Sequence, residues 1–326
     1  MLRYIIRRLL LMIPLLLGIT FMVFAIVNLI PGSPVAQFEA NPRMSQDDIE
    51  RIRSNLGLDE PWPKRYVVWL GNLLHGDLGY SYINGVSVTS QILAVLPNTL
   101  LLTGTATVIA LVVAVPLGVL AAVHRNSWFD NLVYVVATAI GSVPTFWVGL
   151  LAIILFAVKF QEWGLPSLPV GGTSSFREET GLLDRIRHLI MPAVTLGLLS
   201  IASWLLYIRA SMLEVIRQDF IRTAYAKGLD YRVVVYGHAF RNALLPLVTL
   251  IGLTLPDLFG GAFIIEFIFS WNGMGRLAVN AATSSDYTVV MGTFLLLAVM
   301  TLLANLLSDV MYAVLDPRIR YDRQHL

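Results

Sequence analysis

The feature that most constrains this chain is a series of long apolar runs. The first, Leu9–Ile30, contains no charged residue, and five more follow at about Thr99–Val123, Leu132–Val158, Leu189–Ile208, Ala243–Phe269 and Thr288–Leu315. A helix needs about 20 apolar residues to cross the hydrocarbon core of a bilayer, whereas the strands of a transmembrane barrel alternate over about 10 residues. The runs therefore predict an all-α membrane protein with six transmembrane helices, spans 1 to 6, and the lipid bilayer as its surroundings.

The composition agrees with this class of protein. Hydrophobic residues make up 56% of the chain and charged residues only 13%, about half the charged share of a soluble domain. This excludes an ordinary soluble enzyme and a disordered chain. The net charge of +2 is too balanced for a nucleic-acid binder.

No catalytic or metal centre is indicated by the residue pattern. Cysteine is absent and the five histidines are scattered without the spacing of metal ligands. There is no Gly-x-Ser-x-Gly elbow of a serine hydrolase and no Gly-rich loop followed by Lys-Ser/Thr that would hold nucleotide phosphates. We expect no catalytic residue, no bound metal and no enzyme activity in this chain.

The distribution of arginines predicts the topology. Arg3, Arg7 and Arg8 precede the first run, which places the N-terminus in the cytoplasm by the positive-inside rule. The first run is longer than the 7–15 apolar residues of a signal peptide, so we expect it to be retained as a helix. With six spans, the C-terminus is also cytoplasmic. The predicted parts are 1–30 (N-terminus and first span), 31–98 (external), 99–315 (spans 2 to 6) and 316–326 (cytoplasmic tail).

The external segment 31–98 has the pattern of two short helices. Ser45 can cap the first, which Gly57 can end, and the second begins near Pro61 and ends at Gly76. Two short amphipathic helices cannot form a core alone. We expect this small external helical segment to cover the outer ends of the spans, with docking of a partner as the alternative.

The cytoplasmic loop 209–241, called the elbow here, carries six basic and three acidic residues. Its pattern predicts a helix up to Lys227, a left-handed turn at Gly228, and a second helix from Tyr231 to about Ala243 that Asp230 can cap. The first helix has an apolar side, made of Met212, Val215, Ile216 and Phe220. Two interpretations stay open from the residues alone: the elbow lies on the membrane surface, or it inserts into a cleft of another protein.

The elbow resembles the cytoplasmic loop of permease subunits of binding-protein-dependent ABC importers, and specifically the peptide-permease branch, subunit type B. The residues that carry the resemblance, and that the family uses for coupling to its ATPase, are Glu214, Asp219, Arg222, Thr223, Ala224, Ala226, Lys227, Gly228 and Leu229. Six other segments match in the family's order: Leu29–Pro34, Leu56–Pro61, Gly76–Ser81, Phe269–Arg276, Asp286–Tyr287 and Asp316–Tyr321. The chain departs from the family pattern at Ser33, at Asn272 and at Thr288, where a proline usually follows Asp-Tyr.

This resemblance implies a type I ABC importer permease in a prokaryotic inner membrane. A second homologous permease would complete the pathway, and one or two cytoplasmic ATPases would bind ATP and Mg²⁺, so this chain would hold no cofactor. An external binding protein would deliver di- or oligopeptides. Another solute, such as an oligosaccharide, glutathione or nickel, is an alternative with the same mechanism. A secondary transporter is an alternative of another class, and an intramembrane enzyme is more remote.

Polar residues in or near the spans are the candidates for the translocation pathway, because an ionisable group inside a membrane is costly and usually has a function. Asp257 follows Pro256 in the middle of the fifth span and is the first candidate, with helix packing as its alternative. Glu266, near the outer end of the fifth span, is a second candidate, although we expect its side chain to be solvated at the membrane–water interface instead of contacting substrate. Trp271 is expected to anchor at the interface, and Trp271 and Arg276 are candidates for external docking.

Overall fold

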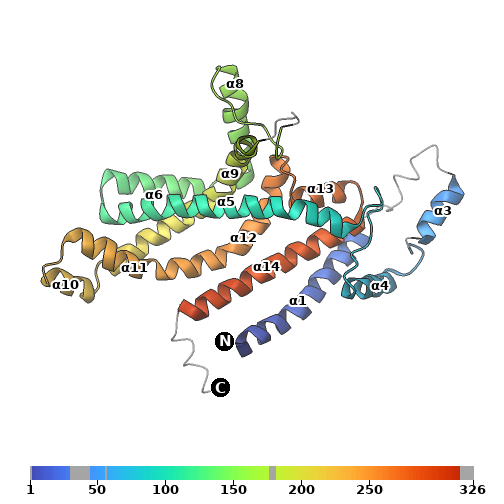
Figure 1. Cartoon of the computed structure of the whole chain (residues 1–326), viewed down its shortest axis with the longest axis horizontal. Coiled ribbons are helices and arrows are strands. Elements are labelled where there is room, and N and C mark those ends of the chain that lie inside the picture. The colour runs from blue at the N-terminus through green and yellow to red at the C-terminus, as the bar shows by residue number, and fades with distance from the viewer. Residues whose placement is uncertain (1, 30–44, 56, 176–180, 316–326) are drawn as a thin grey trace. The chain divides into compact units, whose positions relative to one another are not determined.

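The computed structural model describes residues 2–29, 45–55, 57–175 and 181–315 of the chain. This part is helical and contains no strand, only one isolated bridge between Tyr80 and Ser87. Figure 1 shows the helices along the chain. The prediction of an all-α protein is confirmed.

Five helical segments in the described residues are long and apolar enough to cross a membrane: α1 (Leu2–Leu29), α5 (Val88–Val123), the continuous run of α7 (Thr145–Ala152), η1 (Ile153–Lys159) and α8 (Phe160–Glu162), α9 (Leu182–Val215), and α14 (Tyr287–Leu315). A further apolar helix, α12 (Leu245–Ile268), lies where we predict the fifth span. These helices carry exposed apolar side chains, such as Leu10 and Met22 of α1, each about 60% exposed. Such side chains suit contact with lipid, so the chain is a multi-pass membrane protein.

The third predicted span, Leu132–Val158, is wrong as a single helix. The structure divides it into α6 (Trp128–Gly141), which ends at Ser142, and a second helix that begins at Thr145 after Pro144. Proline has no N–H and disfavours a helical conformation in the residue before it. Both properties suit Pro144 to the position just before a helix, where the structure has it.

The chain forms two compact units by its contacts. The first contains residues 99–271 and 301 onward. Its centre is α9, which packs against α6, α7, α11 and α12. Alanines of α5 are fully buried in this unit, and a Cβ at Gly197 of α9 would lie 2.9 Å from the carbonyl oxygen of Ala106. Only glycine permits so close an approach of the two helix backbones.

The second unit contains residues 2–98 and 272–300, and its helices are α1, α3 (Gln46–Asn55), α4 (Trp62–Leu74), the beginning of α5, α13 (Met274–Thr283) and the first part of α14. Helix α4 packs on α1 through Tyr66, whose ring lies 5.5 Å from that of Phe21 and 5.4 Å from that of Phe24. Edge-on aromatic contacts of this kind add to the burial of the rings. The two predicted helices between spans 1 and 2 are confirmed as α3 and α4.

The short loop before α5 is fixed to the first turn of α14. The carboxylate of Asp286 accepts hydrogen bonds from the Ser81 hydroxyl and from the Tyr82 N–H. Asp286 is buried, and its backbone carbonyl also accepts from Val290. One carboxylate thus holds residues 81–82 and the start of α14 together.

Candidate functional site

The first residues of the elbow, from Arg209 on, belong to α9, which ends at Val215. The chain turns at Ile216–Gln218 and then forms α10 (Asp219–Ala226). The N–H groups of Arg217 and Gln218 bond to carbonyls three residues back, at 3.2 Å and 3.1 Å. The single helix that we predict up to Lys227 is therefore interrupted, because the chain tightens into turns between α9 and α10.

Gly228 ends α10 as the sequence predicts. Its φ is +78°, its N–H bonds to the carbonyl of Tyr225 at 2.9 Å, and the N–H of Leu229 bonds to the carbonyl of Ala224 at 3.4 Å. This pair of bonds is the Schellman motif, in which the left-handed residue is usually glycine because it lacks a Cβ. A Cβ built on Gly228 would meet no atom within 4 Å among the described residues, apart from its two chain neighbours. The residue at this tip is constrained by its backbone and not by packing inside the chain.

The second helix of the elbow begins at Tyr231, after a turn in which the Asp230 carboxylate accepts the N–H of Arg232 at 2.9 Å. It continues as the π-helical stretch η2 (Val233–Ala239) and as α11 (Phe240–Ala243). The predicted helix from Tyr231 to Ala243 is confirmed. The Ser211 hydroxyl of α9 donates to the carbonyl of Ala243 at 3.0 Å, so the last residue of the elbow's second helix is tied back to α9.

One side of the elbow is built into the core of the first unit. Ile221 and Ala224 of α10 are buried with Val234 and Val235 of η2 and with Met212 of α9. Of the predicted apolar side, Met212 and Val215 are buried and Ile216 is partly buried. Phe220 stays 40% exposed. Burial of these side chains makes the elbow a rigid part of the unit.

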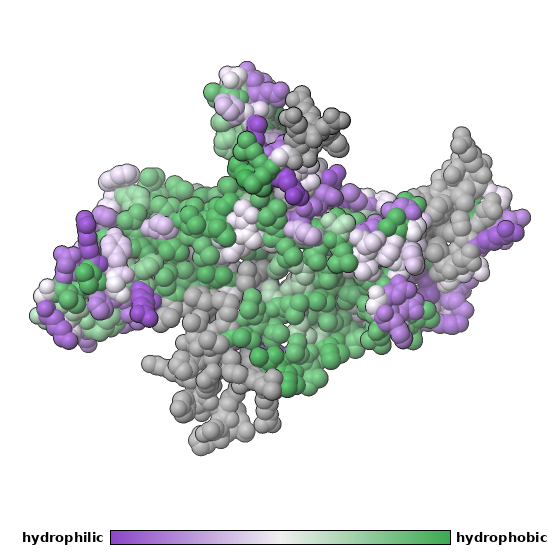
Figure 2. All heavy atoms as spheres, viewed as in Figure 1, coloured by the Kyte–Doolittle hydropathy of each residue, from purple (hydrophilic) through white to green (hydrophobic). Residues whose placement is uncertain are grey.

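The other side of the elbow exposes apolar and aromatic side chains, here named the elbow patch. Its members are each 39–50% exposed: Phe220, Tyr225, Leu229, Tyr231, Val233 and Tyr236. The rings of Tyr225 and Tyr231 stack with their centroids 6.5 Å apart. Partial burial raises the pKa of Tyr231, and the neighbouring Tyr225 and Tyr236 raise it further. Figure 2 shows hydrophilic residues gathered over α10 and α11 with hydrophobic residues among them, next to the largely hydrophobic face over α5 and α6.

Most charged and small residues that the sequence singles out lie on the exposed part of the elbow. Asp219 and Arg222 form a loose pair at 3.4 Å with side chains that are 95% and 77% exposed. Glu214, Thr223, Ala226, Lys227 and Leu229 are exposed as well, whereas Ala224 is buried. The structure thus brings these residues together on one projecting element, and Ala224 supports that element from inside.

Sequence reasoning did not identify Asp130, which holds the start of the elbow. Its carboxylate binds the Arg209 guanidinium at two points, 2.5 Å and 2.8 Å, and accepts the Asn126 N–H at 2.9 Å. Asp130 is 1% exposed, and the hydrogen bond from Arg209 is the main reason that its pKa is lowered. The signal in the sequence is Ser127-x-x-Asp130, a capping pattern at the start of α6, where the Ser127 hydroxyl accepts the Asp130 N–H.

Two residues near the end of α12 differ from the predictions. Glu266 is fully buried, instead of solvated at an interface, and accepts a hydrogen bond from the Thr99 hydroxyl at 2.6 Å. Trp271 is 1% exposed and therefore does not present its ring as an interface anchor or an external docking residue. The reason is a second Schellman motif: Ser270 has a φ of +48°, and the N–H of Trp271 returns to the carbonyl of Glu266 at 2.8 Å. A residue in this position commonly packs back against its own helix.

The remaining candidates are placed by their helices. Pro256 lies inside α12, and Asp257 follows it, although the side chain of Asp257 lies outside the described part. Arg276 is half-buried in α13, in the second unit. Among the described residues no group of three histidine, aspartate or glutamate side chains could hold a metal ion.

Two protein-family models together match most of the chain. Residues 114–321 match the family described as binding-protein-dependent transport system inner membrane component, and residues 1–103 match the N-terminal region of such membrane components.

Individual relatives match over nearly their full length. The oligopeptide transport system permease protein AppB of Bacillus subtilis is 41% identical over 98% of this chain and 99% of its own. The dipeptide transport system permease protein DppB of Escherichia coli is 40% identical over 99% of this chain and 100% of its own.

A solved structure shares the fold. The crystal structure of an amino acid ABC transporter with histidines has a TM-score of 0.51, with 16% sequence identity, covering 69% of this chain and 94% of that chain. The secondary-transporter and intramembrane-enzyme alternatives find no support in these matches. The chain belongs to the family of inner membrane components of binding-protein-dependent transport systems, and it is a permease subunit of that family.

Proposed function

We propose that this chain forms half of the translocation pathway for di- and oligopeptides in an ATP-driven importer. The observation that carries the proposal is the elbow, in which a rigid, core-anchored helix pair ends in an exposed aromatic patch at a glycine turn. The proposal is supported by similarity to relatives named as oligopeptide and dipeptide permeases, which covers nearly the full length of the chain. A second homologous permease completes the pathway, and an external binding protein delivers the peptide.

The elbow is the proposed contact with a cytoplasmic ATPase, which binds ATP and Mg²⁺. Exposed aromatic side chains within a charged rim are typical of a surface that docks on another protein, because the rings supply large contact area and the charges orient the partner. The buried side of α10 packs on α9 and η2. A displacement of the patch is thus passed to these helices as a rigid-body movement and reaches α12 through α11.

The proposed orientation has both termini in the cytoplasm of a prokaryotic cell with an inner membrane. It puts the elbow on the cytoplasmic side and the segment between α1 and α5 outside. Within α12, Asp257 is the proposed pathway residue because it follows a proline, which removes one helical hydrogen bond and frees a carbonyl. Glu266 has a weaker claim to the pathway since it is buried against Thr99. Arg276 remains a proposed external docking residue.

The test of the proposed function has two steps. The tagged chain is first isolated from its own membrane in mild detergent, and co-purifying proteins are identified; we expect a second permease and P-loop ATPases. The complex is then placed in vesicles with its binding protein, and uptake of a radiolabelled dipeptide is measured with and without ATP. The proposal would be contradicted if dipeptide uptake were the same with and without ATP, or if the chain purified without any ATPase. Asp257→Ala should lower uptake without loss of assembly.

A further inference from the structure

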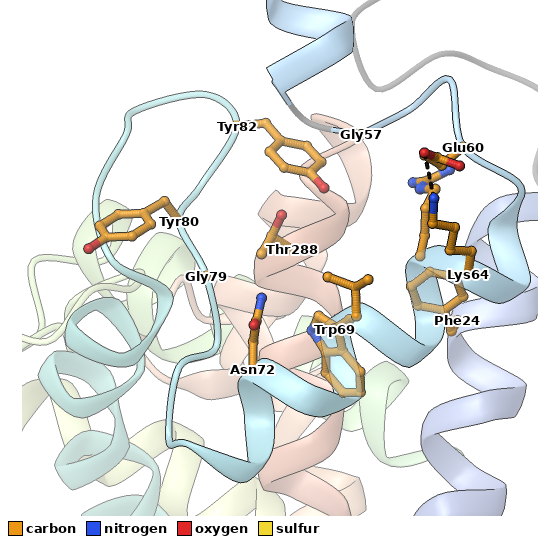
Figure 3. Close-up of a pocket in the computed structure, with 12 residues that line it drawn as sticks. Phe24, Gly57, Glu60, Lys64, Trp69, Asn72, Gly79, Tyr80, Tyr82 and Thr288 are labelled. Atoms are coloured by element: carbon orange, nitrogen blue, oxygen red, sulfur yellow. Dashed lines mark hydrogen bonds and ion pairs between the residues drawn. The ribbon is translucent and has the colours of Figure 1, made fainter.

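A pocket of about 380 Å³ lies in the second unit. Its lining comes from the segment between α1 and α5, from α1 itself and from the first turn of α14. Figure 3 shows that Tyr82, Thr288 and Asn72 extend into the same space from three different segments, with Trp69 beside Asn72 and the Glu60–Lys64 pair across from them. Volumes of this size suit small ligands.

Two buried polar atoms at this pocket have no hydrogen-bond partner in the described part of the chain: Nε1 of Trp69 and Oγ1 of Thr288. Thr288 is 9% exposed. Buried polar groups in native proteins are nearly always hydrogen-bonded, and one left unpaired costs about 1–3 kcal/mol. The indole N–H can only donate. An occupant that satisfies Trp69 must therefore offer an acceptor, and the Thr288 hydroxyl, which can also donate, needs a partner as well.

The charged lining favours an anionic acceptor. Lys64 and Arg65 bring two positive charges and Glu60 one negative charge, and Glu60 already accepts from Lys64 at 2.7 Å. Arg65 donates one hydrogen bond to Asn28 at 3.0 Å. The nearby Asp286 carboxylate accepts from Ser81 and Tyr82 and is not part of the lining. Phe24, Val68 and the Trp69 ring supply apolar surface beside these polar groups.

We propose that this pocket binds the carboxylate of a small peptide or amino acid, with the carboxylate oxygens on Trp69 Nε1 and Thr288 Oγ1 and the apolar side chain against the aromatic lining. The choice of peptides as ligands rests on the proposed function; the preference for a carboxylate rests on the pocket alone. With the proposed orientation, the site is a peptide-binding pocket on the external side of the permease itself.

Thr288 makes this pocket a property of this chain. It occupies a position where the family resemblance leads us to expect proline, which has no hydroxyl. Its methyl group also lies against the loop, because a Cβ on Gly79 would come within 2.9 Å of Thr288 Cγ2. One side chain thus sets the backbone position of Gly79 and supplies a hydrogen-bonding group to the pocket.

The experiment measures binding of Ala-Phe and of its C-terminal amide to the full chain, purified in nanodiscs without binding protein or ATPases, by calorimetry. We expect Ala-Phe to bind and the amide to bind about tenfold more weakly, because a hydrogen bond to a charged group contributes more than one to a neutral group. Trp69→Phe and Thr288→Val should each weaken Ala-Phe binding about tenfold. Thr288→Val keeps the shape of the side chain, whereas Trp69→Phe keeps an aromatic ring but a smaller one, and each change removes one donor.

Two matched variants control for general effects. Trp62→Phe alters a tryptophan of the same helix that does not line the pocket, and Thr283→Val alters an exposed threonine that bonds only within its own helix. Both should bind Ala-Phe as the parent does. Thermal unfolding of every variant is recorded. If Trp69→Phe unfolds at a lower temperature than the parent, Asn72→Ala is used in its place.

The outcomes separate this inference from the proposed function. Equal binding of Ala-Phe and its amide, or unchanged binding by both Trp69→Phe and Thr288→Val, would overturn the proposal that this pocket binds a carboxylate. No Ala-Phe binding, together with weaker attachment of the binding protein to the variants, would also overturn it and assign the pocket to protein docking. Peptide binding by a chain whose complex shows no ATP-dependent uptake would uphold the pocket and reject the proposed function.

Discussion

Arg209 at the end of α9 and Asp130 at the start of α6 form a two-point ion pair inside the first unit. The Nε–Oδ1 distance is 2.5 Å and the Nη2–Oδ2 distance is 2.8 Å. Asp130 is 1% exposed and the Arg209 side chain 21%. This pair fixes the helix that leads into the elbow to the turn between α5 and α6, so it sets the position from which the elbow projects.

Removal of one partner should destabilise the chain more than removal of both. Arg209→Gln leaves the buried Asp130 carboxylate without its cation, which costs about 3–5 kcal/mol in comparable buried pairs. In the double variant Arg209→Gln with Asp130→Asn, two neutral amides remain and much of that loss should be recovered. Thermal unfolding of the purified protein measures both. A double variant that is less stable than the single one would mean that the pair does not act as a unit.

The same pair predicts a response to acid. The pKa of Asp130 is lowered from its ordinary value of 3.8, first by the hydrogen bond from Arg209. A group with a depressed folded-state pKa contributes stability above its unfolded pKa, and this contribution is lost as the pH falls through the folded pKa. We expect the parent protein to lose stability below about pH 4, and the double variant to lose less over that window. Unfolding temperatures recorded from pH 6 to pH 3 test this.

The burial of Glu266 leads to a prediction about packing between α12 and α5. Thr99→Val removes the hydroxyl that donates to the Glu266 carboxylate at 2.6 Å. Loss of a hydrogen bond to a fully buried charged group should cost about 1–3 kcal/mol. Thr107→Val is the matched control on the same helix, because the Thr107 hydroxyl donates to the carbonyl of Thr103 within its own helix. The unfolding temperature should fall for Thr99→Val well below that of Thr107→Val, and equal values would show that Glu266 does not depend on Thr99.

Labelling at two exposed acidic positions tests the proposed orientation. The chain contains no cysteine, so Asp47→Cys and Asp219→Cys each create a single reactive thiol. Asp47 belongs to α3 and Asp219 to the elbow, and both are exposed. In spheroplasts, whose inner membrane is intact, an impermeant maleimide should label position 47. It should label position 219 only after the membrane is permeabilised. Labelling of both from the same side would contradict the orientation.

Much of the fold is predictable from the sequence because local chemistry decides it. The apolar runs require helices, and glycines in left-handed turns end helices at Gly57, Gly76 and Gly228, where φ is +64°, +80° and +78°. Pro61 likewise precedes the first residue of α4. At these positions the residue type restricts the backbone whatever surrounds it.

The errors concern contacts between residues that are distant in the sequence. Trp271 and Glu266 have polar groups that suit an interface, but the turn at Ser270 folds Trp271 inward, and no local pattern marks a serine with positive φ. Glu266 is buried where it accepts the hydrogen bond from Thr99, a residue 167 positions away. Pro144 is compatible with a kink inside one helix or with a new helix, and only the packing of α7 on α9 and α12 selects the second. The Arg209–Asp130 pair joins residues that are 79 positions apart.

The elbow gives the sharpest prediction of the proposed function. Gly228→Asp places a side chain and a charge at a φ of +78°, which strains a residue with a Cβ by about 1 kcal/mol or more. Because no described residue other than its chain neighbours lies within 4 Å of that Cβ, we attribute an effect beyond this strain to a partner. We expect Gly228→Asp to be inserted and folded but to show no ATP-dependent peptide uptake, with weak ATPase attachment or uncoupled hydrolysis. Ala226→Asp, also on the exposed side, should act similarly.

Three controls separate docking from backbone strain. Gly164→Asp meets the same strain at a φ of +66°, also in open space and in the same unit but outside the elbow, and should keep uptake. Gly228→Asn tolerates the left-handed conformation better and adds no charge, so it should be intermediate. Gln218→Ala alters an exposed side chain before α10 and should be mild. Each variant is purified with its ATPases and assayed for ATP hydrolysis and peptide uptake in vesicles. Normal uptake by Gly228→Asp would mean that the elbow does not dock the ATPase, whereas equal loss in Gly164→Asp would assign the effect to strain alone.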